Sequence, residues 1–219
     1  MLLPFNLADL GAVPPTVLNW QSVFNMYLVL GVSGAVFAYG LMFFYILNGR
    51  RKSPPARRGG NGGGRGNLLT LIVVTGIVVA AFIAGVEGNA YMWDAPQNLP
   101  TLTITVHAYQ WGWNFTYPDG YTSTDVLTVP ANTTIILNVT SEDVFHDLGI
   151  PMFDVKADAI PGQWDALWFV ATQTGSYPYA IRCYELCGAG HAYMTANLSV
   201  LTPAAFSSWY THHEPRGVG

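Results

Sequence analysis

The chain has 219 residues, of which 51% are hydrophobic and only 10% are charged. A charged share so far below the roughly 25% of an ordinary soluble domain indicates a membrane-inserted part. The formal net charge is −4 and there are only two cysteines, which excludes a disulfide-rich scaffold and argues against binding to nucleic acid.

Two long uncharged segments predict a transmembrane helical hairpin over residues 21–88. They run from Val23 to Leu47 and from Leu68 to Val86. At about 1.5 Å per residue they would reach roughly 37 and 28 Å, close to the ~30 Å of a bilayer core. The alternative, two core helices of a soluble protein, is disfavoured because such helices seldom extend so far without a charge. Residues 1–20 show no basic segment followed by an apolar one, so a cleaved signal peptide is not evident. We expect these residues to form an exterior N-terminal segment.

The connection between the two segments, residues 48–67, is strongly basic. It contains six of the nine basic residues of the chain, Arg50, Arg51, Lys52, Arg57, Arg58 and Arg65. Short basic loops stay on the cytoplasmic side of a membrane. Both ends of the chain are therefore expected on the exterior (periplasmic) side of a cell membrane or an equivalent energy-transducing membrane.

Residues 89–205 are expected to form an exterior all-β domain, followed by a C-terminal tail over 206–219. Short runs rich in Val, Ile, Thr and aromatic residues are separated by Gly, Pro, Asn and Asp, which is the pattern of a sandwich or small barrel. The runs are LTITVHA, DVLTVP, TTIILNVT, FDVKAD, DALWFV, YPYAIR and TANLSVL. From residue 89 onward there are eleven acidic and three basic residues, a net charge of −8. This excess indicates either solubility alone or electrostatic steering of a basic partner.

The stretch CYELCGAGHAYM, residues 183–194, holds both cysteines together with His191 and Met194. Three ordinary interpretations compete: a disulfide between Cys183 and Cys187, a structural zinc site, and plain core packing of Met194. Two thiols, an imidazole and a thioether at short spacings instead form a soft ligand set that favours copper.

A copper site on a β-sandwich would need a further histidine from an earlier strand end. His146 follows the apolar run TTIILNVT at a turn and is the best candidate. His107 lies within a predicted strand beside aromatic residues, and His212 and His213 lie in the polar tail.

The presence of two thiols bears on whether the site would hold one copper ion or two. A mononuclear blue site would use His146, one cysteine, His191 and Met194, and would leave the second thiolate unexplained. Two coppers bridged by both thiolates would use every donor, with one imidazole on each metal. The weak positions would fall to Met194 and the backbone carbonyl of Glu185.

These residues resemble a known family. The motif C-x-E-x-C-G-x-x-H-x-x-M, S-x-D-V-x-H at 141–146, K-A-D-A-I-P-G at 156–162 and Q-W-x-W at 110–113 are similar to those of subunit II of haem–copper cytochrome c oxidases. The resemblance covers the hairpin and the whole exterior domain, and the cysteine motif is its most specific part. It implies an N-terminal two-helix transmembrane hairpin plus an all-β cupredoxin-like Greek-key sandwich over residues 89–205, docked on subunit I.

The resemblance also implies a site. It assigns a dinuclear copper centre, CuA, to His146, Cys183, the carbonyl of Glu185, Cys187, His191 and Met194. Trp111 would be the electron-entry residue, with an ordinary half-buried sheet tryptophan as the alternative. The carboxylate of Glu185 would reach a magnesium (or manganese) ion shared with subunit I, and Asp158 would lie near this contact in a supporting role.

Three features depart from the family pattern. The start of the second helix, RGNLLTLIVV, lacks the acidic residue that the family uses in proton uptake, so this role is not expected here. Asp147 and Leu148 replace a Ser-Phe pair, and Gln163 and Trp164 stand where the family often has an arginine. The last two changes leave the copper ligands intact but alter the expected polar contacts to haem propionates and to subunit I.

We therefore expect the copper-bearing subunit II of a respiratory terminal oxidase. It would accept electrons from an external cytochrome c or small blue copper protein and pass them to haem in subunit I, where O2 is reduced to water and protons are pumped. A quinol-oxidase subunit is disfavoured because the copper ligands are present. Two alternatives stay open: the CuA subunit of a related nitric oxide reductase, and a membrane-tethered metal-binding module without electron transfer.

Overall fold

The computed structural model describes residues 15–49 and 64–213, and the chain divides into two compact units. One unit comprises Gln21–Tyr91, and the other joins the residues up to Trp20 to those from Met92 onward. Most of the basic connection predicted at 48–67, most of the predicted N-terminal segment and the end of the predicted tail lie outside the described residues.

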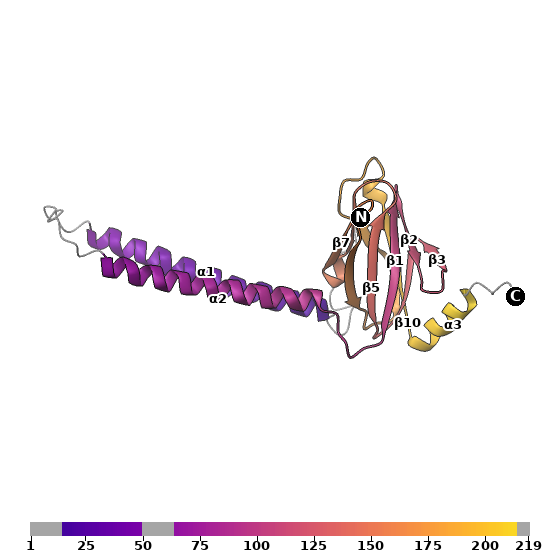
Figure 1. The fold of residues 1–219 in the computed structure, drawn as a ribbon, viewed down its shortest axis with the longest axis horizontal. Coiled ribbons are helices and arrows are strands. Elements are labelled where there is room, and N and C mark those ends of the chain that lie inside the picture. Colours follow the sequence, from indigo (N-terminus) through magenta and orange to yellow (C-terminus); the bar gives the residue numbers. More distant parts are fainter. Residues whose placement is uncertain (1–14, 50–63, 214–219) are drawn as a thin grey trace. The chain divides into compact units, whose positions relative to one another are not determined.

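Two helices form the helical unit, α1 (Pro15–Gly49) and α2 (Gly64–Trp93). Figure 1 shows them lying side by side, and the hydroxyl of Tyr27 in α1 donates a hydrogen bond to the carbonyl of Ala81 in α2 at 3.3 Å. Their described side chains are mostly apolar and exposed, which is the surface expected of helices in contact with lipid.

One helical stretch among the described residues is long and apolar enough to cross a membrane. It runs over Thr16–Asn48 with a mean hydropathy of 1.9, and a shorter apolar stretch runs over Ile72–Val86. The first predicted span is therefore confirmed as a membrane-capable helix. The second span, and with it the hairpin, stays a prediction.

The second unit is a β-sandwich of two five-stranded sheets, as predicted (Figure 1). One sheet has the order β3 (Thr122–Thr124), β2 (Gly112–Thr116), β1 (Thr101–Tyr109), β5 (Thr134–Ser141), β8 (Asp165–Val170). The other has the order β4 (Val126–Pro130), β10 (Thr195–Leu201), β9 (Gly175–Cys183), β6 (His146–Ile150), β7 (Val155–Ala159). The β1–β5 and β4–β10 pairs are parallel, so each sheet is mixed.

The core lies between the two sheets and explains the strand pattern. In β1, Ile104, Val106 and Ala108 are fully buried while the residues between them are partly exposed, as a half-buried strand requires. Across the core, the rings of Phe153 and Phe169 stack with centroids 4.5 Å apart. Each of the seven predicted runs contains one strand, which confirms those predictions.

Three strands, β2, β3 and β6, and the helix α3 (Pro203–His213) were not predicted. The expectation of a polar tail holding His212 and His213 is corrected, because both residues end α3. The ring of His213 lies 4.6 Å from that of Tyr121, and Phe206 is buried. Aromatic contacts with distant strands hold this helix, and a local sequence pattern does not show them.

Tyr117 lies beneath α3 and provides a test of this packing. Its hydroxyl donates to the carbonyl of Thr128 and accepts from the N–H of the same residue, both at 2.8 Å. Burial raises the pKa of Tyr117, so the hydroxyl keeps the proton that it donates. Replacing it by Phe leaves both backbone groups unpaired, and we expect Tyr117→Phe to lower the free energy of unfolding by about 1–3 kcal/mol.

Urea unfolding of the detergent-solubilised full chain, followed by tryptophan fluorescence, measures this change. Tyr121→Phe is the matched control because Tyr121 belongs to the same aromatic cluster, and its hydroxyl makes no hydrogen bond within the part of the chain that the structure describes. Equal losses in the two variants would contradict the assignment.

Candidate metal centre

Pairing between β6 and β9 brings the two predicted ligand segments together. His146 is the first residue of β6 and Cys183 is the last residue of β9. The two strands are antiparallel neighbours, with Leu148 opposite Cys183. The start of one strand and the end of the other therefore meet at the same edge of the domain.

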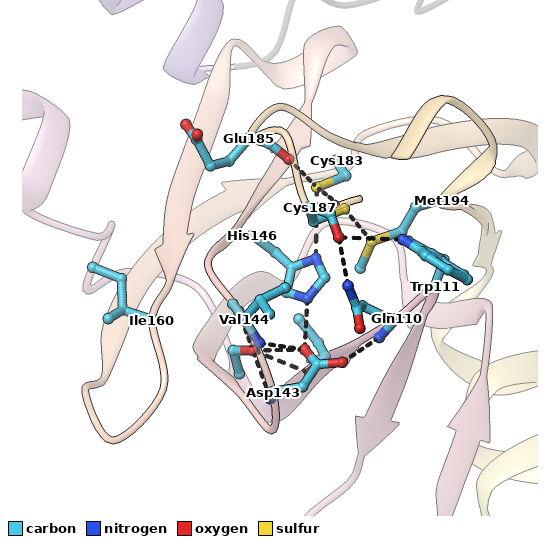
Figure 2. Close-up of polar contacts among 12 residues, drawn as sticks. Gln110, Trp111, Asp143, Val144, His146, Ile160, Cys183, Glu185, Cys187 and Met194 are labelled. Atoms are coloured by element: carbon cyan, nitrogen blue, oxygen red, sulfur yellow. Dashed lines mark hydrogen bonds and ion pairs between the residues drawn. The ribbon is translucent and has the colours of Figure 1, made fainter. Parts of the chain in front are cut away.

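The donor atoms of five side chains gather at this edge, and Figure 2 labels His146, Cys183, Cys187 and Met194 among them. The Sγ atoms of Cys183 and Cys187 lie 3.7 Å apart. Nδ1 of His146 lies 3.8 Å from Sγ of Cys183, and Nδ1 of His191 lies 3.7 Å from Sγ of Cys187. Sδ of Met194 lies 3.7 Å from Sγ of Cys187. His146 and Met194 are fully buried and both cysteines nearly so, whereas His191 is only partly buried, so the three sulfur atoms and His146 are shielded from water.

The backbone of the segment 183–194 closes on itself. The N–H of Cys183 donates to the carbonyl of Met194 at 3.1 Å, so the first and last donors of the segment are neighbours. Between them, Gly188 has a φ of +121°, and a short 3-10 turn, η3, runs over His191–Tyr193. Since side chains other than hydrogen disfavour that backbone conformation, glycine suits this position.

The two thiols are not bonded to each other. A disulfide needs a sulfur–sulfur distance of about 2.05 Å, whereas these sulfurs are 3.7 Å apart and both cysteines are free. The disulfide interpretation is therefore wrong for this structure. Burial, together with the neighbouring Cys183, raises the pKa of the Cys187 thiol to about 12, so this thiol is protonated at neutral pH in the absence of a metal.

Asp143 orients the imidazole of His146. Nε2 of His146 lies 2.9 Å from Oδ1 of Asp143, which leaves Nδ1 facing Cys183. The same carboxylate accepts from the backbone N–H groups of Val144 and Gln110 at 2.6 and 2.7 Å. Although burial opposes ionisation, these hydrogen bonds lower the pKa of Asp143, so the carboxylate is an acceptor at neutral pH.

The donor set and its spacing suit a soft metal. Tetrahedral thiolate sites have metal–sulfur bonds of about 2.3 Å, which places their donors about 3.8 Å apart. The separations of 3.7–3.8 Å observed here match that spacing. A zinc site would use the cysteines and histidines and leave the thioether of Met194 without a role, whereas copper accepts thioether ligands. The cluster is therefore consistent with a copper site.

Glu185 presents two different groups. Its backbone carbonyl lies 3.2 Å from Sγ of Cys183, and Figure 2 shows its carboxylate pointing away from the sulfurs.

Asp158 lies opposite Asp147 in the β6–β7 pair. Burial raises the pKa of the Asp147 carboxyl despite its 2.6 Å contact with Lys156, and the charges of Asp158 and Glu185 add to this effect. Three carboxylates thus interact beside the cluster.

Trp111 contacts the ligand segment directly. It lies in the turn between β1 and β2 and is 44% exposed. Its indole N–H donates to the carbonyl of Cys187 at 3.3 Å. A Cβ atom at Gly190 would overlap the indole ring, so the close contact between the ring and this segment requires glycine there.

The sequence singled out all six residues that the structure brings together, but not the residues that support them. Gln110 donates from Nε2 to the carbonyl of Cys187 at 2.7 Å, and Asp143 orients His146. Both residues stand in the quoted motifs. The contact of Gln110 spans 77 positions of the sequence, and that of Asp143 spans 3. Only the short spacing from Asp143 to His146 could have indicated such a contact.

The part of the chain that carries the donor residues matches the model of a known protein family. Residues 120–200 match the model described as cytochrome c oxidase subunit II, periplasmic domain. This range includes His146 and the whole segment 183–194.

Individual relatives agree with that match. The heme-copper oxidase subunit 2 of Aeropyrum pernix is 38% identical over 141 residues, which cover 63% of this chain and 60% of that protein. The cytochrome c oxidase subunit 2 of Thermostichus vulcanus is 38% identical over 116 residues, covering 53% and 35%. The chain thus spans between 35% and 60% of the length of these two relatives. A crystal structure of the periplasmic domain of subunit II of cytochrome oxidase from Bradyrhizobium japonicum is 34% identical, with a TM-score of 0.48, and covers 51% of this chain and 92% of that one.

The raised pKa of Cys187 predicts how metal binding depends on pH. Its thiol is protonated at pH 7 because its pKa is about 12, whereas a metal binds the thiolate. We expect copper(I) binding to the reduced, metal-free full chain to release at least one proton. The apparent affinity should therefore rise about tenfold per pH unit for each proton released.

A pH indicator in weakly buffered detergent solution counts the protons, and a competing chelator gives the affinity. Cys187→Ser serves as the comparison and should release fewer protons. An affinity that stays constant between about pH 6 and 8 would contradict the assignment of this thiol as a ligand.

Proposed function

The chain belongs to the cytochrome c oxidase subunit II family, and we propose that it is the copper-bearing subunit of a respiratory terminal oxidase. In this role it accepts electrons one at a time from an external cytochrome c or small blue copper protein. It passes them to haem in subunit I, where O2 is reduced to water and protons are pumped. The main support is the pair of buried, unbonded thiols, 3.7 Å apart, among imidazole and thioether donors.

Two copper ions use this donor set more completely than one. Cys183 and Cys187 would bridge both ions, with His146 beside the first sulfur and His191 beside the second. Met194 and the carbonyl of Glu185 would supply the weak ligands. When bound, such a CuA centre supplies reversible one-electron transfer with the charge shared between two metals.

The protein keeps these donors fixed. Asp143 holds the imidazole of His146, and the hydrogen bond from Cys183 to Met194 closes the segment that carries the other donors. Burial of His146, Met194 and both cysteines keeps water away from these four donors. Donors that are already in place need little rearrangement when the charge at the site changes.

Trp111 is the proposed point of electron entry. Its indole is partly exposed and also bonded to the carbonyl of Cys187, so it contacts both solvent and the ligand segment. From residue 89 onward the chain has a net charge of −8. This negative charge would attract a basic donor and increase the rate at which the two proteins meet.

The carboxylate of Glu185 is the proposed ligand for a magnesium (or manganese) ion at the contact with subunit I. It points away from the sulfurs while the carbonyl of the same residue faces them (Figure 2). One residue would thereby touch both metal sites. Asp158 is proposed to support this contact, because its charge acts on the same buried carboxyl, Asp147, as that of Glu185.

The helical unit is proposed to anchor the subunit as a two-span hairpin. Residues 16–48 supply the membrane-capable helix and residues 72–86 the apolar part of the second. The basic residues between the helices would keep their connection on the cytoplasmic side, which places the copper domain outside. Subunit I, other oxidase subunits and lipid would surround the helices.

Metal content and electron paramagnetic resonance of the full chain, purified in detergent, test the copper proposal. We expect two coppers per chain that share one unpaired electron. Cys183→Ser should lose this signal because a serine hydroxyl is a poor substitute for a bridging thiolate. Ser199→Cys, which places a third thiol on β10 away from the cluster, should leave the signal unchanged. One copper per chain, zinc alone, or a disulfide between the native cysteines in the assembled oxidase would refute the proposal.

Reporter fusions test the hairpin. Alkaline phosphatase folds only outside the cytoplasm, so a fusion after His213 should be active and a fusion within residues 48–67 should be inactive. The reverse holds for a fluorescent protein that folds only inside. Activity of phosphatase at both positions would show that the second helix does not cross the membrane.

A further inference from the structure

The turn between β1 and β2 lies against both ligand segments. Tyr109 and Gly112 are opposite each other in this hairpin, so Gln110 and Trp111 form the whole connection. A two-residue connection leaves little freedom in the backbone, because the paired strands fix both of its ends. The positions of these two residues are therefore set by the sheet.

Gln110 makes hydrogen bonds to two different segments (Figure 2). Its backbone N–H donates to Oδ2 of Asp143, and its side-chain Nε2 donates to the carbonyl of Cys187, both at 2.7 Å. The other oxygen of Asp143 pairs with His146 at 2.9 Å. Gln110 thus reaches one proposed copper ligand directly and a second through a single carboxylate.

Trp111 shares the acceptor that Gln110 uses. Its indole N–H donates to the same Cys187 carbonyl at the longer distance of 3.3 Å. A carbonyl oxygen has two lone pairs, and these two donors occupy both. The shorter bond from Gln110 therefore has the larger part in fixing the carbonyl to which the indole is attached.

We propose that Gln110 is a positioning residue that holds the Cys187 carbonyl for the indole of Trp111, and thereby sets the electronic coupling between Trp111 and Cys187. This inference rests on the function proposed above. The path from the indole to Sγ of Cys187 crosses one hydrogen bond and then only covalent bonds within Cys187. One electron leaves the external donor and reaches the proposed metal centre along it, and no bond forms or breaks and no proton moves.

Two simpler roles for Gln110 make different predictions. Because Gln110 is exposed, it could contact the electron donor, in which case its loss would weaken donor binding. Alternatively it could only stabilise the fold, in which case its loss would lower the unfolding free energy and leave electron entry unchanged. A positioning role instead changes the environment of the indole and the limiting rate of electron entry.

The test uses Gln110→Glu, Gln110→Ala and the control Gln163→Ala. Glutamate has the shape of glutamine, but its carboxylate has no proton to donate to a carbonyl. Gln163 is also exposed, and within the described ranges its side chain makes no hydrogen bond.

The first measurement needs no copper. In the reduced, metal-free full chain with 15N-labelled tryptophan, the indole N–H of Trp111 is assigned with Trp111→Phe. We expect Gln110→Glu and Gln110→Ala to shift this resonance and to speed its hydrogen exchange, while Gln163→Ala leaves both unchanged. An unchanged resonance in the two Gln110 variants would overturn the inference.

The second measurement follows stopped-flow reduction of the assembled oxidase by cytochrome c. We expect the saturating rate of Gln110→Glu to fall about tenfold, the lower end of the loss typical for partners of metal ligands, with the half-saturating donor concentration unchanged. A raised half-saturating concentration with a normal saturating rate would show a docking role instead, and wild-type kinetics would show no role; either result overturns the inference. If the wild-type chain holds no copper pair, the proposed function fails, and the indole measurement still decides whether Gln110 holds the contact.

Discussion

The separation of two buried sulfur atoms is the constraint on which the rest of the site depends. Neighbouring thiols in an oxidising compartment tend to form a disulfide, whereas here the sulfurs of Cys183 and Cys187 lie 3.7 Å apart. The strand end fixes the first sulfur, and the bonds that Gln110 and Trp111 make to the Cys187 carbonyl fix the segment that carries the second. The fold therefore stabilises a spacing that a metal can use and that a disulfide cannot.

The sandwich fixes the positions of the donors because two of them are the end residues of its strands. His146 begins β6, whose five residues are all buried, and Cys183 ends β9. The supporting contacts come from the other sheet, since the turn after β1 presents Gln110 and Trp111 to the segments that follow β5 and β9. Contacts from both sheets thus hold the donor segments in place. A loss of core packing would therefore change the distance between the two sulfur atoms.

Much of this could be predicted from the sequence, because the signals are local. Runs rich in Val, Ile, Thr and aromatic residues predicted seven of the strands, and the spacing of Cys, His and Met predicted the donors. His146 was placed at a turn, whereas it starts β6, whose sequence HDLGI contains only one residue of the strand-favouring types. The helix α3 was missed because its aromatic side chains pack on Tyr117 and Tyr121, far away in the sequence. The bond from Gln110 to Cys187 spans 77 positions, and no local pattern encodes a contact of that range.

The hydrogen bond between Cys183 and Met194 also has a bearing on how such proteins diversify. It pins the two ends of the intervening backbone at the spacing of the neighbouring pair Arg182 and Thr195. The segment between Cys183 and Met194 can therefore be replaced by one of another length or with other metal-binding side chains. The register of the strands on either side does not depend on it. One scaffold can therefore acquire new redox chemistry by grafting a single short peptide.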